Sequence, residues 1–471
     1  MQNVSPGIRK VLLLNPPFDG LYIRDQWCSH MSKGTYFRQP VDLLMLSGRL
    51  HADGYELAVV DAVAEGLSAE KAQRRVEKFG PDAIIFLTGV DSLKDDIAFV
   101  TESKRRGAKV AVIIGDVVRD AGGKLLDDYP VLDACLSDYV THGVHAFLQG
   151  DAGAAVNMFV RTPDGPRKVK ASPPPKYFKL PPPRYDLFPL RRYRLPYDRH
   201  NPYAAVLTSD WCPYKCSFCP LALSPYRMRD VDDLLENLEV VRRMGIRQVH
   251  FPDYTFAVNR KQALGIVEGM ITRKFNFTWT CWSRVDVIDH DLMKLMKRAG
   301  CDLIEFGVES GNQAMLDRYK KETTVEQIRA AFRSANQLGV STIGTFVLGL
   351  PGETCETMKE TLDLVLEIEP TFCSFNVASP RPASSVRQEL IAEGAYDPEQ
   401  PDPLDSSRSF PVFSTETLSA EEVYQFRKQA LRRFYMRPSY ILRRLRRINS
   451  LEQLGNHVRN GLSVARQSIV G

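Results

Sequence analysis

The sequence contains no run of about 18 uncharged apolar residues, the length that a membrane-spanning helix needs. Its first residues, MQNVSPGIRKVLLLNPP, also lack the order of basic, apolar and small-residue regions that is typical of a secretory signal. We therefore expect a cytoplasmic protein. At 471 residues, of which 44% are hydrophobic, the chain is long enough for two or three domains with sizeable cores.

Cysteine is scarce and unevenly placed. The nine cysteines are odd in number and six of them are isolated, which argues against a disulfide framework. The other three, Cys212, Cys216 and Cys219, fall within the short stretch CPYKCSFCP. Three clustered cysteines in a cytoplasmic chain favour a metal-binding or catalytic role.

A large excess of charge of one sign is also lacking. The net charge is only +5, and most of the surplus lies between Val423 and Leu451, which contain nine Arg or Lys and no Asp or Glu. This distribution argues against a general nucleic-acid surface. The basic tail has two interpretations. One is a solvated helix that packs its apolar residues on the protein, namely Phe434, Tyr435, Ile441 and Leu442. The other is a peripheral contact with anionic lipid.

What the sequence does contain is a regular alternation of strands and helices. In residues 1–149 this pattern predicts an α/β, Rossmann-like domain with a parallel sheet. The expected strands are 11–15, 56–62, 81–89 and 108–116, and the expected helices are 41–54, 68–80 and 93–106. Ligands bind at the carboxyl ends of such strands. These ends are Asn15-Pro16, Asp61-Ala62, Thr88-Gly89 and Gly115-Asp116.

A second alternating region follows a proline-rich stretch. Residues 150–200 are predicted to be an extended linker without regular hydrogen-bonded ladders. Residues 201–392 are predicted to form a partial (β/α)6 TIM-type barrel with active residues at the carboxyl ends of its strands. Its expected strands are 203–209, 247–251, 277–283, 302–308, 341–348 and 372–378. Residues 393–471 are expected to be a mostly helical, basic C-terminal region with an interruption at Pro438.

The cysteine triplet has an unusual spacing for a metal site. C-x3-C-x2-C is neither the usual zinc-finger pair nor the ferredoxin run. Three thiolates at this spacing can ligate three irons of a cubic iron–sulfur cluster and leave the fourth iron open to a substrate or cofactor. The alternative is a zinc ion completed by a distant residue such as His250 or Cys281.

The stretch C212-PYK-C216-SF-C219 resembles the signature of the radical S-adenosylmethionine (SAM) superfamily. The resemblance implies that the three cysteines hold a 4Fe–4S cluster whose open iron binds SAM. One electron then cleaves SAM to methionine and a 5′-deoxyadenosyl radical, which abstracts hydrogen from the substrate. It also implies an electron donor such as flavodoxin or ferredoxin.

Four later stretches resemble SAM-side motifs of the same superfamily. They are VHFPDYTFAVNRK (249–261), WTCWSRVDVID (279–289), IEFGVESGNQ (304–313) and TIGTFVLGLPGET (342–354). The resemblance implies that Phe218 packs near adenine, Asp253 faces the SAM amino group and Arg284 faces its carboxylate. It further implies that Glu309 contacts the ribose and that Gly349 approaches the adenine. No catalytic residue is assigned.

The layout of an α/β domain ahead of the barrel resembles the cobalamin-binding branch of this superfamily. ESGNQAMLDRYKK and GTFVLGLPGET are most similar to the branch with the anaerobic magnesium-protoporphyrin monomethyl ester cyclase and hopanoid-associated enzymes. The resemblance implies a small-molecule, lipid or porphyrin-like substrate, and methylation, oxidative cyclisation or rearrangement. It also implies cobalamin, for which the candidate binding residues are Asn15, Pro16, Thr88, Gly89 and Gly115.

Three departures from that branch are visible in the sequence. No D-x-H-x-x-G follows the first strand, and the nearest histidine, His30, has different neighbours. The usual Gly-Gly after the fourth strand reads Gly115-Asp116. SPRPASS (379–385) replaces the expected Pro-Tyr-Pro-Gly-Thr and brings Arg381 near the barrel mouth. The alternative of a different class is a non-enzymatic iron–sulfur or zinc protein that senses redox state or scaffolds a pathway.

Overall fold

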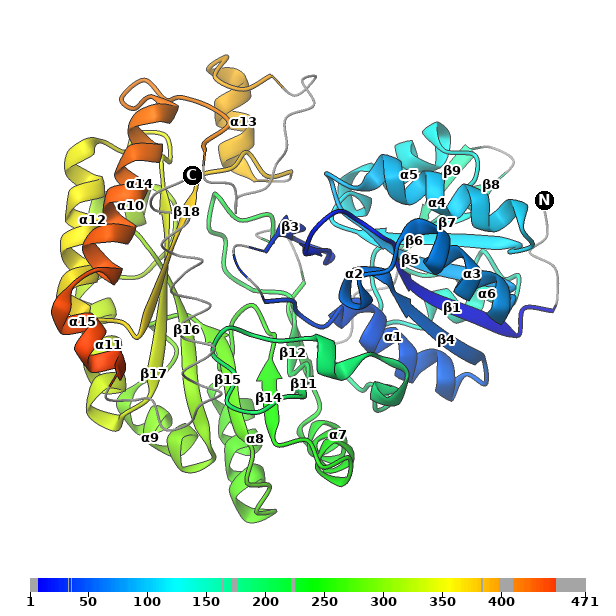
Figure 1. Ribbon diagram of the computed structural model, residues 1–471, viewed down its shortest axis with the longest axis horizontal. Coiled ribbons are helices and arrows are strands. Elements are labelled where there is room, and N and C mark those ends of the chain that lie inside the picture. Colours follow the sequence, from blue (N-terminus) through cyan, green and yellow to red (C-terminus); the bar gives the residue numbers. More distant parts are fainter. Residues whose placement is uncertain are drawn as a thin grey trace. The chain divides into compact units, whose positions relative to one another are not determined.

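The computed structural model describes residues 7–32, 34, 36–162, 165–170, 176–221, 225–382, 384–397 and 410–445. The chain divides into two compact units, one of Met1–Ser32 and Tyr36–Leu195 and the other of Lys33–Thr35 and Pro196–Gly471. Each unit carries its own sheet of mainly parallel strands with helices beside it (Figure 1). The predicted mixed α/β class is therefore confirmed.

The first unit is built on a seven-stranded sheet with the order β4-β1-β5-β6-β7-β8-β9. Every residue of β5 and β6 is buried, which explains why both strands read as continuous apolar runs instead of alternating ones. The strands are β1 Lys10–Asn15, β4 Glu56–Asp61, β5 Ala83–Thr88, β6 Val110–Gly115 and β7 Ala134–Leu136. The helices are α1 Val41–Ala52, α2 Ala62–Glu65, α3 Ala69–Phe79, α4 Leu93–Arg105, α5 Val118–Asp128 and α6 Gly143–Leu148.

A short hairpin follows the first strand of this unit. Its strands are β2 Tyr22–Ile23 and β3 His30–Met31, which pair antiparallel. Tyr22 and Ile23 are both buried, so the hairpin is packed into the unit.

The prediction that residues 150–200 form no regular ladder is wrong for their first part. Strands β8 Met158–Thr162 and β9 Gly165–Val169 form an antiparallel hairpin, and β8 pairs antiparallel with β7. The physical reason is a period-two pattern, because Met158 and Val160 are buried while Phe159 and Arg161 are more exposed. The later part contains β10 Tyr177–Phe178 and two 3₁₀ turns, η1 Tyr185–Leu187 and η2 Leu190–Arg192.

The second unit is built on six parallel strands that follow the chain order β11-β14-β15-β16-β17-β18. Each strand coincides with one of the six expected from the sequence. They are β11 Tyr203–Ala205, β14 Gln248–Phe251, β15 Thr278–Ser283, β16 Cys301–Glu309, β17 Ser341–Leu348 and β18 Phe372–Val377. The helices between them are α7 Val231–Arg243, α8 Arg260–Thr272, α9 His290–Arg298, α10 Gln313–Arg318, α11 Val325–Leu338 and α12 Cys355–Ile368.

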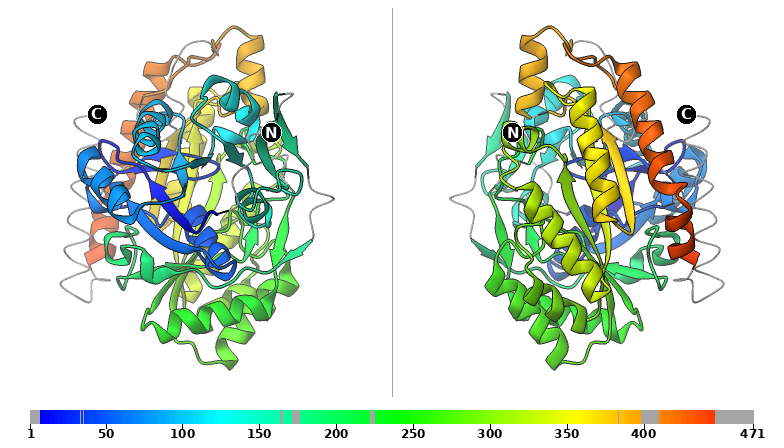
Figure 2. Two further views of the ribbon diagram at one scale, coloured as in Figure 1. Left: turned by 90° about the vertical axis from the view of Figure 1, so that its right-hand side faces the viewer. Right: turned by 90° about the vertical axis from the view of Figure 1, so that its left-hand side faces the viewer.

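Three further helices end the described chain: α13 Ser385–Ala392, α14 Ala420–Tyr435 and α15 Pro438–Leu445. Pro438 is the first residue of α15, a position where the missing backbone N–H of proline is tolerated. In Figure 1 and the right-hand view of Figure 2, α14 runs beside α12 and β18. Residues 446–471 of the predicted C-terminal region lie outside the described residues. No helix in the described part of the chain is long and apolar enough to cross a bilayer.

Side chains from α14 and α15 bond to the backbone of β18 and the residue before it. The Tyr435 hydroxyl donates to the Cys373 carbonyl at 2.7 Å and accepts from the Cys373 N–H at 3.1 Å. Arg427 donates to the Phe375 carbonyl and Tyr440 to the Thr371 carbonyl. These contacts hold the C-terminal helices to the last strand of the sheet.

Candidate functional site

The three clustered cysteines lie on one loop of the second unit. The loop connects β12 Ser209–Asp210 to β13 Arg227–Arg229, and these two strands pair antiparallel. At its base the Asp210 carboxylate and the Arg227 guanidinium form an ion pair whose side chains are only 3% and 2% exposed. A buried pair of this kind holds the two ends of the loop together.

The thiols influence one another. Burial raises the pKa of Cys216, and it raises the pKa of Cys219 to about 12; in both cases a neighbouring cysteine raises it further. The Cys219 N–H also donates to the Cys216 carbonyl at 3.0 Å, and the Cys212 sulfur lies 3.5 Å from the Thr255 hydroxyl. Cysteine binds a metal as the thiolate, so a metal centre at this loop has to displace the thiol protons that burial favours.

Arg284 lies against this loop. Its side chain is buried, and its Nε and Nη2 atoms donate to the two Asp286 carboxylate oxygens at 2.9 and 3.0 Å. Its guanidinium carbon is 3.7 Å from the centre of the Tyr214 ring, and its Nη1 is 3.9 Å from the Cys216 sulfur. The prediction that Arg284 contacts the SAM carboxylate stays a prediction, because the observed contacts are with the cysteine loop.

Asp253 follows β14 and is fully buried. Its carboxylate accepts hydrogen bonds from the Thr208 N–H at 2.8 Å, the Ser209 N–H at 2.6 Å and the Thr208 hydroxyl at 2.8 Å. Burial raises the pKa of Asp253 to about 6, against the effect of these bonds. The observed contacts hold the chain just before Cys212, and the predicted contact with the SAM amino group remains untested.

Glu309 ends β16 in the left-handed backbone region, at a φ of 70°. Its carboxylate accepts a 2.7 Å hydrogen bond from Lys321, whose side chain is 6% exposed. A methyl group on Gly307 would lie 2.6 Å from the carboxylate and 3.0 Å from the ammonium, so the pair packs directly over this glycine. Strained non-glycine residues cluster at functional sites. Lys321, which the sequence analysis did not single out, thus contacts a predicted site residue directly.

Gly349 follows β17, also with a positive φ, of 81°. Its N–H donates to the buried Glu353 carboxylate at 2.5 Å. A methyl group added at Gly349 would lie 3.0 Å from the Val423 side chain of α14. Burial raises the pKa of Glu353 to about 7. Glu353 was visible in the sequence as the acid of GLPGET, yet nothing there distinguished it from an exposed glutamate.

Phe218 and the Gly349 loop are linked through one tyrosine. The Phe218 ring meets the Tyr319 ring edge-on with centroids 6.4 Å apart, and the Tyr319 hydroxyl donates to the Pro351 carbonyl at 2.5 Å. Tyr319 therefore connects the segment that carries Phe218 with the loop after β17, through a ring contact on one side and a hydrogen bond on the other.

The two residues proposed for a zinc site lie within strands. The Nδ1 atom of His250 in β14 is 2.8 Å from the Thr280 hydroxyl, and Cys281 in β15 is buried beside Cys301. Within the described ranges, no three His, Cys, Asp or Glu side chains are gathered around a position for a single metal ion.

In the first unit, the predicted cobalamin residues take part in a buried polar network. Arg24 forms an ion pair with Asp96 at 2.6 Å, and both side chains are 0% exposed. Arg24 also donates to the Asn15 side chain and the Pro16 carbonyl, while the Thr88 hydroxyl donates to Asp96. These groups satisfy one another.

The two glycines at the carboxyl ends of β5 and β6 are also closely surrounded by protein atoms. A methyl group on Gly89 would lie 2.5 Å from the Tyr22 hydroxyl, and one on Gly115 would lie 2.1 Å from the Thr88 carbonyl oxygen. Asp116 accepts from the Ser29 N–H at 2.8 Å, and the Nδ1 atom of His30 is 2.8 Å from the Cys28 carbonyl. The β2–β3 hairpin region thus packs on the carboxyl ends of β5 and β6.

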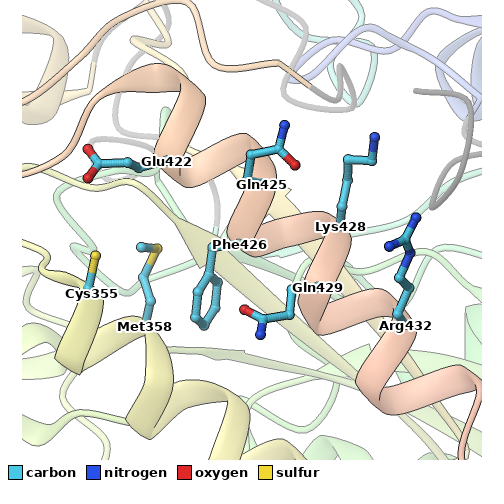
Figure 3. A pocket seen from close by; sticks show the side chains of 8 residues that line it. All are labelled: Cys355, Met358, Glu422, Gln425, Phe426, Lys428, Gln429 and Arg432. Atoms are coloured by element: carbon cyan, nitrogen blue, oxygen red, sulfur yellow. The ribbon is translucent and has the colours of Figure 1, made fainter.

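A pocket of about 490 Å³ lies elsewhere on the second unit, between α12 and α14. Figure 3 shows Phe426 of α14 facing Met358 of α12, with Lys428 and Arg432 farther along α14. None of the predicted site residues lines it, so it is separate from the cysteine loop.

The comparisons with known proteins agree with the sequence motifs. Residues 206–365 match the radical SAM superfamily. An uncharacterized methyltransferase of Pyrococcus horikoshii is 25% identical over 93% of this chain and 94% of its own. The anaerobic magnesium-protoporphyrin IX monomethyl ester cyclase of Rubrivivax gelatinosus is 27% identical over 74% of this chain and 66% of its own.

Among solved structures, the radical SAM methyltransferase TsrM of Kitasatospora setae, with cobalamin and a [4Fe-4S] cluster bound, has the same fold. The TM-score is 0.68 at 15% identity, over 99% of this chain and 100% of TsrM. The expected likeness to the cyclase branch is confirmed, and the non-enzymatic alternative finds no support. Residues 206–365 therefore carry a radical SAM domain, and the protein is an enzyme whose cofactors are a [4Fe–4S] cluster and SAM.

Proposed function

We propose that Cys212, Cys216 and Cys219 ligate the [4Fe–4S] cluster and leave its fourth iron for SAM. The observation that supports this proposal is their position on a single loop at the carboxyl side of β11, closed at its base by the β12–β13 pair. Because one loop carries all three thiols, they can converge on one cluster when it binds. When bound, the cluster supplies the electron that cleaves SAM.

The residues around the loop are proposed to position SAM. The Glu309–Lys321 pair offers a carboxylate at the end of β16 for the ribose hydroxyls, and the Gly349 loop offers backbone close to the adenine. Phe218 packs beside that loop through Tyr319 and is proposed to cover the base. Asp253 is proposed to act by fixing Thr208 and Ser209, which precede the cysteines.

The wider architecture is part of the same proposal. We take the six parallel strands of 201–392 as a partial (β/α)6 barrel, with 1–149 as a Rossmann-like domain, 150–200 as the connecting segment and 393–471 as a C-terminal region. A chain-ordered, all-parallel sheet with helical crossovers supports this view.

Cobalamin is proposed as a further cofactor because the fold follows that of TsrM across both units. The five residues first considered for it do not fit as its ligands. Asn15, Pro16 and Thr88 bond within the protein, and Gly89 and Gly115 face protein atoms at short distance. The corrinoid is therefore assigned no ligand here, and no reaction step is derived from it.

For the reaction we propose carbon methylation, or an oxidative cyclisation or rearrangement, of a small molecule. The relatives named as a methyltransferase and as a porphyrin ester cyclase support this range. A flavodoxin- or ferredoxin-type donor would supply the electron. A lipid or porphyrin-like substrate would also suit a peripheral membrane contact through α15, where Ile441 and Leu442 are exposed beside Arg443 and Arg444.

The test is anaerobic reconstitution of the full chain with iron and sulfide, followed by SAM and dithionite. We expect about four irons per chain and release of 5′-deoxyadenosine. Replacing Cys212, Cys216 and Cys219 together by Ala should abolish both, whereas Cys355→Ala, an exposed cysteine on α12, should change neither. A triple variant that still binds the cluster would refute the ligand assignment.

A further inference from the structure

We propose that Arg284 is a positioning residue that hydrogen-bonds the sulfur of Cys216 and raises the reduction potential of the cluster. The inference rests on the proposed function, because it requires Cys216 to be a cluster ligand. It gives Arg284 a different role from the SAM contact implied by the family resemblance.

The contact itself is direct. Arg284 Nη1 lies 3.9 Å from the Cys216 sulfur, and both side chains are buried. Hydrogen bonds to ligating sulfurs are among the factors that set the potential of iron–sulfur clusters. A reduced cluster carries one more negative charge than an oxidised one, so a neighbouring cation stabilises the reduced form.

The orientation of the guanidinium is fixed by its other contacts. Nε and Nη2 are taken up by Asp286, and Nη2 also donates to the Glu322 carbonyl at 3.3 Å. Because the guanidinium is planar and rigid, holding one edge on Asp286 directs Nη1 toward the sulfur.

The same side chain also holds the backbone segment that carries the cysteines. Tyr214 lies between Cys212 and Cys216 in the sequence, and its ring stacks on the Arg284 guanidinium at 3.7 Å. Arg284 therefore contacts both the loop and one of its thiols, which a residue reserved for the SAM carboxylate would not need to do.

A second buried cation, Lys321, has a different partner. Its ammonium is bonded to the Glu309 carboxylate at 2.7 Å. Of the two, Arg284 is the one that hydrogen-bonds the Cys216 sulfur. The cluster is thus expected to respond to Arg284 even when SAM is absent.

The test is Arg284→Gln in the reconstituted full chain. We expect normal iron and sulfide content. In a redox titration without SAM, followed by electron paramagnetic resonance, the ratio of reduced to oxidised cluster at a fixed potential should fall about tenfold, or about 59 mV. Arg273→Gln, an exposed arginine of the same unit, should leave the potential unchanged. An unchanged potential with weakened SAM binding in Arg284→Gln would overturn the inference in favour of the SAM contact.

Two milder variants cover the case in which Arg284→Gln does not fold. Arg284→Lys keeps the charge without the planar fork, and Asp286→Asn keeps the guanidinium while weakening its anchor. In each variant the ratio of reduced to oxidised cluster at the same fixed potential should fall by less than tenfold. If neither variant changes that ratio, the inference is overturned. If the wild-type chain binds no cluster through its three cysteines, the proposed function fails instead, and the two failures are distinguishable.

Discussion

The carboxyl ends of the two parallel sheets, where ligands bind in such folds, differ in how their polar groups are satisfied. In the first unit, Arg24, Asp96 and Thr88 bond to one another and are buried. In the second unit, the corresponding end carries two partly buried thiols and a third, buried thiol that an arginine hydrogen-bonds. The polar groups of the first edge are thus satisfied within the protein, whereas the second edge carries the cysteines that we propose as cluster ligands.

The largest effect should come from breaking the polar network of the first edge. Asp96→Ala leaves the buried Arg24 without its carboxylate, which typically costs about 3–5 kcal/mol in the free energy of unfolding. Urea denaturation would measure the loss, and Asp95→Ala, an exposed neighbour, is the matched control. A loss below about 1 kcal/mol would show that this edge is not held by the ion pair.

A smaller effect is expected from adding one methyl group to the same edge. Gly89→Ala places a carbon 2.5 Å from the Tyr22 hydroxyl and 2.6 Å from Ser29 Cβ. Overpacking of this kind costs about 1–3 kcal/mol. Faster hydrogen exchange of the β2–β3 hairpin would locate the change, and the control is Gly123→Ala in α5, where the methyl group would lie 4.0 Å from its nearest neighbours. Equal losses in the free energy of unfolding in the two variants would show that crowding at Gly89 is not the cause.

The smallest effect concerns pH and the second unit. Burial raises the pKa of Glu353 from 4.5 to about 7. Between these values the folded chain binds more protons at this group than the unfolded chain does, so its contribution to the free energy of unfolding falls as pH rises. We expect a decline on the order of 1 kcal/mol from pH 5 to 7.

Glu353→Gln should remove that share of the pH dependence, because the amide cannot ionise. Glu356→Gln, an exposed residue two positions into α12, should preserve it. Denaturation curves at several pH values would decide, and an identical slope in wild type and Glu353→Gln would exclude Glu353 as the group responsible.

The sequence predicted the strands and the loop that depend on patterns between residues near one another in the chain. Apolar runs and glycine stops predicted all six strands of the second sheet and four strands of the first, and the cysteine spacing predicted the loop. The β8–β9 hairpin was missed because prolines and basic residues concealed a period-two pattern. The Arg24–Asp96 pair joins positions 72 residues apart, and nothing local marks either partner.

The candidate site shows the same division. Cys212, Cys216 and Cys219 could be proposed from spacing alone, since one loop carries all three. The roles of Arg284 and Lys321 depend on which strands adjoin in space. Arg284 was selected from its motif, but its contacts with Tyr214 and Cys216 depend on the fold. Lys321 follows a short helix and carried no signal of its own.

The contacts between α14, α15 and β18 have a consequence for solubility. An outermost strand offers bare N–H and C=O groups to which a second polypeptide can add, and proteins must block such edges. Here Arg427, Tyr435 and Tyr440 bond to alternate positions along that margin, at Phe375, Cys373 and Thr371. The C-terminal helices thus cover the edge of the sheet at β18. A truncation before residue 420 would expose this edge to pairing with a strand of a second chain.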